Sequence, residues 1–202
     1  MATIYTIGHS TRSLDELVAA LQAHGIRTLV DIRAFPMSRR LPHFNRESLE
    51  LDLPKHNIDY VWMKELGGRR KKVRDDSPNT GLRNDSFRNY ADYMLTPEFA
   101  QGIERLLQLA EETADPSAAM AKPGPPALGM TNDKGGPRNI AIMCAERMYF
   151  QCHRMLVSDY LTVHGHTVLH IDDDKRPLRQ HKLMAEAHLV DGKVLYNAQE
   201  LF

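Results

Sequence analysis

The first 32 residues predict a strand, a helix and a second strand joined by short turns, and this unit restricts the fold more than any other segment. Apolar and polar residues alternate over residues 2–7, as in a β-strand. Ser13 and Glu16 have the spacing of a capping box at a helix start. Apolar side chains then recur at helical intervals, at Leu14, Leu17, Val18 and Leu21. Gly25 ends the helix, and residues 27–32 form the near-continuous apolar run of a buried parallel strand. Such units are right-handed almost without exception, which favours an α/β fold.

Strand and helix patterns continue to alternate along the rest of the chain. Asn45 is a candidate cap for a short helix that weakens near Pro54. We expect strands at 58–63, 139–144 and 167–171, helices around Phe87, from Thr96, at 148–164 and at 180–187, and a hairpin at 189–196 with an Asp-Gly turn. The sequence therefore predicts a three-layer α/β/α sandwich on a mostly parallel, five-stranded, Rossmann-like sheet with a small C-terminal hairpin. We expect residues 1–202 to form a single domain.

Residues 113–138 interrupt this pattern. Five of the 11 prolines and four of the 12 glycines of the chain lie there, with almost no large apolar side chains. This composition predicts a flexible surface insert within the domain, because strands are expected on both sides of it.

Composition limits the classes of partner and compartment. The 26 basic and 26 acidic side chains give a formal net charge of zero, so bulk charge does not indicate binding to nucleic acid or to an anionic membrane. No apolar run approaches the ~18 residues of a bilayer span, and the first residues lack the long apolar region of a signal peptide. The spacing of Cys144 and Cys152 matches no usual zinc pattern, and two cysteines fit a reducing compartment. We expect a cytoplasmic protein.

The candidate functional residues follow the predicted strands. In open α/β sheets, ligands bind outside the carboxyl ends of the strands, so side chains just beyond these ends are expected to share one rim. Those that follow the first and second strands are His9 and Ser10, then Asp31, Arg33 and Ser38. Those that follow the fourth and fifth strands are Cys144, Glu146 and Arg147, then Asp172. His153 and Arg154, in the first turns of the next helix, are expected close to the same rim.

Cys144 is the strongest of these candidates. It ends an apolar run ahead of a predicted helix, and a helix start or a nearby arginine lowers the pKa of a thiol and makes it nucleophilic. A buried, inert cysteine at a strand end fits the same pattern. Cys152 follows helical spacing with Leu156 and Tyr160, which favours a place in the core.

The other candidates divide into two groups. We expect His9, Glu146 and His153 to be catalytic with Cys144, because histidine and glutamate are common general acids and bases. The predicted substrate-binding residues are Ser10, Asp31, Arg33, Ser38 and Arg154. Structural roles remain open for several of them: His153 and Arg154 on a solvated helix face, and Asp31 and Arg33 as an ion pair that fixes a loop.

Several motifs together resemble a known family, the domain of unknown function DUF488. They are Thr6-Ile-Gly-His-Ser10, Val30-Asp31-Ile-Arg33 with Pro36 and Ser38, Leu66-Gly-Gly68, and Cys144-Ala-Glu146 followed by Cys152-His153-Arg154. The resemblance implies a compact α/β domain of bacteria and archaea whose cysteines are suspected of function, without a settled reaction. It also implies that Cys152 and His153 are more than core residues, and the proline-rich insert departs from the family pattern. A weaker likeness to rhodanese-type sulfur carriers lacks their arginine six residues after the cysteine, where this chain has Phe150.

Three functions are consistent with these residues. The first is a thiol-dependent enzyme acting on an anionic substrate, with phosphate compounds as one class. The second is a phosphate- or nucleic-acid-binding module with structural cysteines, in which Arg33, Arg39, Arg40 and the basic run 69–74 form a positive face. The third is a metal site made by Cys144, Cys152 and His153, with His9 as a further ligand. The sequence identifies no cofactor and no oligomeric state.

Overall fold

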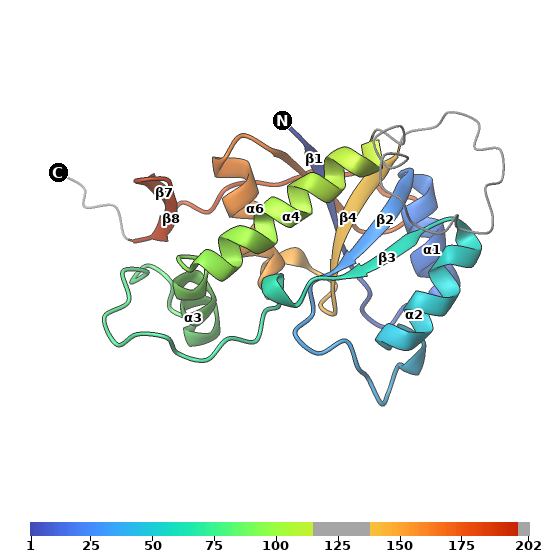
Figure 1. Ribbon diagram of the computed structural model, residues 1–202, viewed down its shortest axis with the longest axis horizontal. Coiled ribbons are helices and arrows are strands. Elements are labelled where there is room, and N and C mark those ends of the chain that lie inside the picture. Colours follow the sequence, from blue (N-terminus) through green and yellow to red (C-terminus); the bar gives the residue numbers. More distant parts are fainter. Residues whose placement is uncertain (115–137, 198–202) are drawn as a thin grey trace, which may run out of the picture.

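The computed structural model describes residues 1–114 and 138–197 and has a mixed α/β fold around a mostly parallel sheet (Figure 1). The sheet has six strands in the order β3-β2-β4-β1-β5-β6. They are β1 (Thr3–Gly8), β2 (Ile26–Asp31), β3 (Asp59–Trp62), β4 (Asn139–Cys144), β5 (Thr167–Ile171) and β6 (Arg179–Gln180). The first five pair in parallel, and β6 adds a short antiparallel edge. The predicted sheet is therefore confirmed, with one strand more than expected.

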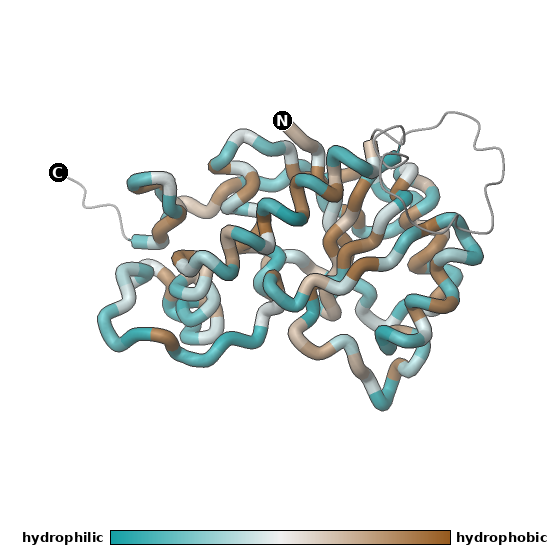
Figure 2. Tube along the Cα trace, viewed as in Figure 1, coloured by the Kyte–Doolittle hydropathy of each residue, from teal (hydrophilic) through white to brown (hydrophobic). Residues whose placement is uncertain are grey.

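Helices cover both faces of the sheet. Helices α1 (Leu14–Ala23) and α2 (Arg46–Asp52) lie on one face, while α3 (Asp85–Tyr93), α4 (Pro97–Ala114) and α6 (Arg154–Val163) lie on the other (Figure 1). Along β4, Ile140 and Ile142 join the core beneath α4 and α6, whereas Ala141 and Met143 join the core beneath α1. Burial on both faces explains why the strands are continuous apolar runs, visible as the brown centre of Figure 2.

The first strand–helix–strand unit forms as its sequence predicts, whereas the side-chain cap expected at Asn45 does not form. The Ser13 side chain accepts from the Glu16 backbone N–H and Glu16 reaches back, which completes the capping box. Gly25 has a positive φ of 64°, a conformation that glycine adopts without strain. The Asn45 side chain does not cap α2; its Oδ1 accepts from the backbone N–H of Ser38 at 2.6 Å. Asn45 is thus the N-cap residue of α2 as predicted, with the extended backbone of that position, but without the side-chain capping bond.

The helix predicted at 148–164 is shorter than expected. A 3-10 turn, η4, occupies Tyr149–Gln151, Cys152 is extended (φ −144°, ψ 173°), and α6 begins at Arg154. Cys152 thus lies outside the helix, and the helical spacing that placed it in the core does not apply. Cys144 is also further from the helix start than its sequence context suggested.

The C-terminal region contains one wrong prediction and one confirmed prediction. Residues 180–187 are not helical: the His181 backbone N–H bonds to Val168 O on β5, and the Met184 N–H bonds to the Asp159 carboxylate. These tertiary bonds replace the i→i−4 bonds of a helix. The hairpin forms from β7 (Ala187–Val190) and β8 (Lys193–Tyr196), with positive φ at Asp191 and Gly192 as a type I′ turn requires.

A buried chain of polar side chains joins β1, β5 and α6, and no sequence pattern predicts it. Thr6 Oγ1 lies 2.7 Å from His170 Nδ1, His170 Nε2 lies 3.0 Å from His181 Nδ1, and His181 Nε2 lies 2.8 Å from Asp159 Oδ1. The ring of Tyr149 stacks on His170 with centroids 3.6 Å apart. Burial, followed by the nearby His181, lowers the pKa of His170 to about 3, so His170 is neutral at pH 7.

Two further expectations concern the membrane and the insert. No helix within residues 1–114 and 138–197 is long and apolar enough to cross a bilayer. Nearly all of the predicted insert at 113–138 lies outside the described residues; its first two residues end α4.

Candidate functional site

The carboxyl ends of β1, β4 and β2 meet at one rim of the sheet. Gly8 pairs with Cys144, the His9 backbone N–H donates to Cys144 O at 3.0 Å, and the Ile32 N–H donates to Met143 O at 3.0 Å. The connection from β1 runs over the face of α1, and the connection from β4 runs over the face of α6. The crevice between these two strands is therefore the switch point at which such sheets bind ligands.

The turn after Cys144 approaches β1 too closely for any side chain on Gly8. A Cβ atom at Gly8 would lie 1.9 Å from the backbone oxygen of Glu146. Real Cβ atoms do not approach backbone oxygen at this distance, so a glycine is required. The glycine of the Gly8-His9-Ser10 motif thereby lets the turn at residues 145–147 close over the end of β1.

A pocket of about 750 Å³ opens at this rim. Among the residues that line it are eight of those singled out from the sequence: His9, Ser10, Arg33, Ser38, Cys144, Glu146, Cys152 and His153. Asp31 and Arg154 were expected to bind substrate, but they lie behind the wall, with 0% and 1% of their surface exposed. Cysteine, histidine and arginine side chains therefore lie at one rim, as expected from the sequence.

Cys144, Cys152 and His153 converge at the base of the pocket, where their ligand atoms all lie within 4.8 Å of one another. Cys144 Sγ is 3.9 Å from His153 Nδ1. His153 Nε2 lies 2.9 Å from the backbone oxygen of Ile32. A carbonyl oxygen only accepts, so Nε2 carries the ring hydrogen and Nδ1 directs its lone pair toward the sulfurs. His153 is buried rather than on the solvated helix face considered above.

The two thiols have opposite acidities. The pKa of Cys144 is lowered from 9.0 to about 7, first because the Cys152 thiol hydrogen-bonds to the Cys144 thiolate. The positive charge of Arg154 and the backbone N–H groups of Ala145 and Glu146 lower it further, while burial opposes them. The same hydrogen bond, together with burial, raises the pKa of Cys152. Cys144 is therefore the thiol of the pair that ionises first, and Cys152 is the hydrogen-bond donor to its thiolate.

Arg154 fixes the loop that carries these groups. Its Nε donates to Cys152 Sγ at 3.3 Å, and its Nη2 donates to the backbone oxygens of Glu146 and Arg147. With these bonds made and its side chain buried, Arg154 contributes charge from below the pocket rather than a direct contact with a ligand.

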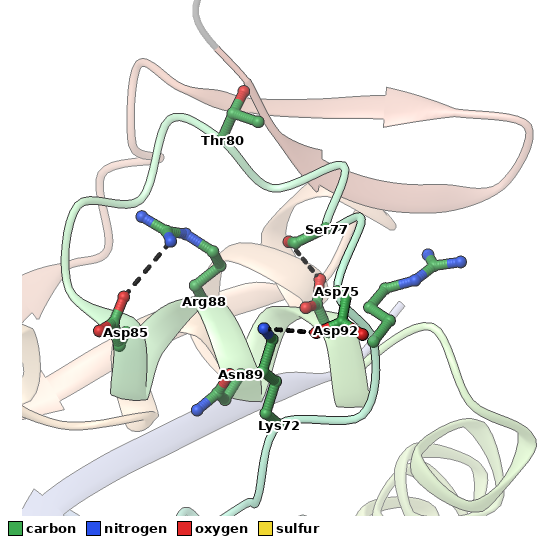
Figure 3. Close-up of a pocket in the computed structure, with 9 residues that line it drawn as sticks. Lys72, Asp75, Ser77, Thr80, Asp85, Arg88, Asn89 and Asp92 are labelled. Atoms are coloured by element: carbon green, nitrogen blue, oxygen red, sulfur yellow. Dashed lines mark hydrogen bonds and ion pairs between the residues drawn. The ribbon is translucent and has the colours of Figure 1, made fainter.

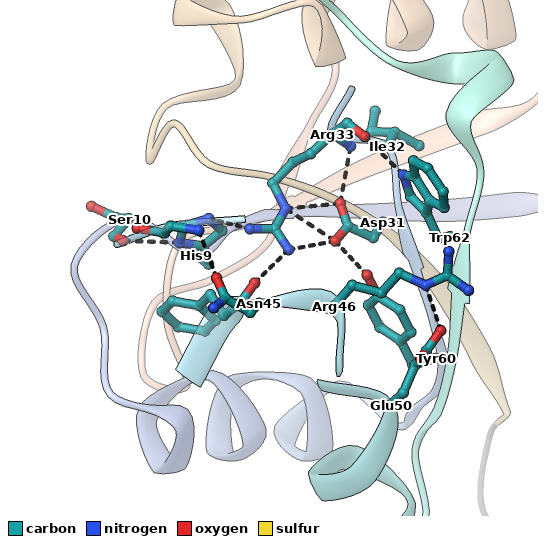
Figure 4. A network of polar contacts seen from close by, with 12 residues as sticks. His9, Ser10, Asp31, Ile32, Arg33, Asn45, Arg46, Glu50, Tyr60 and Trp62 are labelled. Atoms are coloured by element: carbon teal, nitrogen blue, oxygen red, sulfur yellow. Dashed lines mark hydrogen bonds and ion pairs between the residues drawn. The ribbon is translucent and has the colours of Figure 1, made fainter. Parts of the chain in front are cut away.

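Arg33 is the centre of a second network beside the pocket (Figure 4). Its Nε and Nη2 bind the Asp31 carboxylate at 2.5–3.0 Å, and Nη2 also donates to Phe44 O at 2.7 Å. Tyr60 OH donates to Asp31 Oδ2 at 2.7 Å, and Trp62 Nε1 donates to Arg33 O at 2.9 Å. The structural alternative, an ion pair that fixes the loop after β2, therefore describes these contacts.

Arg33 of this network also bonds to His9 and affects its pKa. Arg33 Nη1 donates to His9 Nε2 at 3.2 Å, which leaves Nδ1 to donate to Ser10 O at 2.9 Å. Burial and the positive charge of Arg33 lower the pKa of His9 to about 4. His9 is thus neutral at pH 7 with both ring nitrogens bonded, a geometry that favours positioning over proton transfer.

Two residues near His153 were missed as functional neighbours. A Cβ at Gly68 would lie 2.1 Å from His153 Nδ1, so the second glycine of Leu66-Gly-Gly68 leaves room for the imidazole ring. The Tyr90 ring lies 5.0 Å from the His153 ring, and its hydroxyl donates to Leu66 O at 2.8 Å. The Gly-Gly pair was a visible signal in the sequence, whereas Tyr90 looked like any other apolar position on a helix.

The basic run 69–74 does not form a uniform positive face. Lys72 Nζ pairs with Asp75 at 2.7 Å, within a second pocket that mixes basic and acidic side chains (Figure 3). Arg74 pairs with Asp76 at 3.5 Å. Arg70 bonds to the backbone oxygens of Lys64, Glu65 and Gly67 and stacks over Tyr93. Arg69 is the residue of this run that lines the large pocket.

Comparison with known families gives one match. The family described as domain of unknown function DUF488 matches residues 13–122, more than half of the 202 residues. The chain belongs to the DUF488 family. The matched segment includes the Asp31–Arg33 network and the Leu66-Gly-Gly68 motif, while the Cys144 and Cys152 motifs follow it. No curated protein and no solved structure matches the chain.

Proposed function

We propose that this DUF488 protein is a thiol-dependent enzyme in which Cys144 is the nucleophile for a small anionic substrate. The observation that carries the proposal is the position of Cys144: its sulfur lies at the base of a pocket of about 750 Å³, where a thiol donor and two backbone N–H groups favour the thiolate. A thiolate, rather than a thiol, is the attacking species in cysteine chemistry.

The charges around the pocket support an anionic substrate. Arg69 and Arg147 are exposed on its wall, with Glu146 as the exposed carboxylate available for proton transfer. The buried Arg154 guanidinium adds a positive charge behind the pocket wall and lowers the pKa of Cys144. Several guanidinium groups therefore act on the same region, and they would raise the local concentration of an anion.

The experiment compares two alkylating reagents of similar size, neutral iodoacetamide and anionic iodoacetate. The rate of modification of Cys144 is measured by mass spectrometry between about pH 6 and 10. We expect a midpoint near pH 7, and a ratio of anionic to neutral rates at least about tenfold above that of free cysteine. Arg147→Gln should reduce this ratio without moving the midpoint far.

Two controls define the result. Cys144→Ser identifies the modified residue, and Arg39→Gln removes an exposed charge that does not line the pocket and should leave the ratio unchanged. A midpoint at the pKa of an ordinary thiol would refute nucleophile activation. A ratio no greater than that of free cysteine would refute the preference for an anion.

A metal centre is the second candidate, favoured by the ring orientation of His153. Histidine ligands commonly donate their other N–H to a carbonyl, as His153 Nε2 does to Ile32 O. Two cysteines and one histidine with an open position toward a pocket would suit Zn²⁺. Protein purified without chelators should then carry about one zinc per chain, and Cys152→Ser should lose it. Metal-free protein that does not bind added Zn²⁺ would eliminate this candidate.

The nucleic-acid-binding alternative has less support. Three of the side chains that would form its positive face, Arg33, Lys72 and Arg74, are paired with Asp31, Asp75 and Asp76. Binding to DNA that weakens steeply with salt and persists in Cys144→Ser would favour it nevertheless.

A further inference from the structure

We infer that Cys152 is the resolving thiol for Cys144, so that the pocket carries out dithiol–disulfide exchange with a small anionic organic disulfide. This inference rests on the proposed role of Cys144 as nucleophile and adds the substrate class and the second reacting residue.

The geometry places the second sulfur where a resolving thiol must be. The two sulfurs lie within 4.8 Å of each other, and both cysteines line the pocket. Cys144 is fixed at the end of β4, whereas Cys152 lies in the extended segment between η4 and α6. A residue outside regular structure can rotate and shift toward its partner more easily than one inside a helix, and forming a disulfide requires such an approach to about 2 Å.

The chemistry is balanced in two steps. The Cys144 thiolate attacks one sulfur of the substrate disulfide, whose S–S bond breaks, and the first substrate thiolate leaves with the electron pair and takes a proton from solvent. Cys152 then gives its proton to Nδ1 of His153 and attacks Cys144 Sγ, which breaks the mixed disulfide and releases the second substrate thiolate. This thiolate takes the proton from His153, which becomes neutral again. The protein dithiol is oxidised by two electrons, and the disulfide is reduced to two thiols. A dithiol reductant reverses the oxidation of the protein.

Neighbouring groups fit each step. The His153 Nδ1 lone pair faces the sulfurs because Nε2 is bonded to Ile32 O. The Arg154 Nε–H, 3.3 Å from Cys152 Sγ, stabilises the charge that develops on this sulfur when it attacks or leaves. The pocket is far larger than a peroxide needs, and its exposed Arg69 and Arg147 suit the carboxylates of a disulfide such as an oxidised small peptide.

Glutathione disulfide, which is anionic, serves as the probe. Reduced wild-type protein, Cys152→Ser and Cys144→Ser are each mixed with it, quenched with acid and measured by intact mass. We expect wild type to lose two hydrogen atoms, because an internal disulfide replaces the transient adduct. Cys152→Ser should accumulate one glutathione adduct on Cys144, and Cys144→Ser should remain unmodified over the same time. The uncharged hydroxyethyl disulfide should react at least about tenfold more slowly with wild type.

The outcomes separate this inference from the proposed function. If wild type retains the glutathione adduct as long as Cys152→Ser does, Cys152 does not resolve, although Cys144 is still a nucleophile. If glutathione disulfide reacts with none of the proteins while iodoacetate still modifies Cys144 rapidly, the substrate class is wrong and the proposed function stands. If an adduct forms on Cys152 first, the assigned order of the two thiols is wrong. Thermal unfolding of both serine variants, with Tm values close to wild type, shows that the losses are chemical.

Discussion

Removal of the Cys152 thiol should change the reactivity of Cys144 in a way that depends on pH. The Cys152 hydrogen bond is the largest cause of the lowered pKa of Cys144, and burial acts against it. In Cys152→Ala the donor is lost while the burial remains, so the pKa of Cys144 should return toward 9.0. A change of two pKa units corresponds to about 2.7 kcal/mol of differential stabilisation of the thiolate.

The expected rates follow from this shift. At pH 7 a thiol with a pKa of about 7 is half ionised, and one with a pKa near 9 is ionised to about 1%, a difference of about 50-fold. The more basic thiolate is more nucleophilic by about eightfold over two units, given a Brønsted slope of about 0.45. Cys152→Ala should therefore react about sixfold more slowly than wild type at pH 7, and faster than wild type above about pH 8.

The assay is the initial rate of reaction with a chromogenic aryl disulfide as a function of pH, followed by thiolate release. Cys152→Ser is the matched control, because its hydroxyl can still donate to the Cys144 thiolate and should hold the midpoint closer to that of wild type. Equal midpoints for wild type and Cys152→Ala would refute the reasoning, because the hydrogen bond would then not be the cause of the activation.

Three further predictions concern stability. Gly68→Ala should cost about 1–3 kcal/mol and slow alkylation of Cys144, because the new Cβ forces the His153 ring to move; denaturant unfolding and iodoacetamide rates measure both effects. The folded-state pKa of His170 lies below its unfolded value, so the unfolded chain takes up a proton first and stability falls as pH drops from about 6.5 toward 3; at pH 5 the loss from this residue is about 2 kcal/mol by denaturant unfolding. Arg33→Met should destabilise the protein by about 3–5 kcal/mol in thermal or denaturant unfolding, because it leaves the fully buried Asp31 carboxylate without its cation.

Each of these predictions has a control. Gly81→Ala, where the new Cβ meets no atom closer than 3.2 Å, should cost less than Gly68→Ala. In His170→Gln the loss of stability between pH 6.5 and 5 should be smaller than in wild type, and an unchanged slope would contradict the assignment to His170. The double variant Asp31→Asn with Arg33→Met should be more stable than Arg33→Met alone, since no buried charge is left unpaired; the opposite order would contradict the ion-pair argument.

Much of the fold could be predicted from local patterns. The capping box at Ser13, the alternating apolar runs and the Asp-Gly turn act over a few residues, and all three have the predicted structure. The position of Cys144 at the end of β4, beside Gly8 of β1, follows from the general rule that parallel strands carry their functional residues at the carboxyl edge.

The interactions that decide the site act between residues distant in sequence. Arg33 bonds both to His9 and to the Phe44 backbone oxygen, and burial together with the charge of Arg33 lowers the pKa of His9 so that its ring is neutral at pH 7. In the same way, the buried Arg154 donates hydrogen bonds to the backbone oxygens of Glu146 and Arg147 and holds the loop before α6 in place. Cys152 therefore lies in this loop and not in the helix that its spacing predicted.

The sequence by itself determined the family, the layered α/β fold and the edge of the sheet on which the reactive groups lie, because these depend on periodicity, turn chemistry and strand direction. Only the tertiary structure decided that Cys152 and Arg154 act on the Cys144 thiol, and which guanidinium groups face the pocket. Residues 180–187 show the same division: their local composition favours a helix, yet bonds to Val168 and Asp159 hold them in a non-helical conformation. The physical reason is that burial and hydrogen bonding set acidity and charge pairing, and these depend on neighbours that the linear order of residues does not reveal.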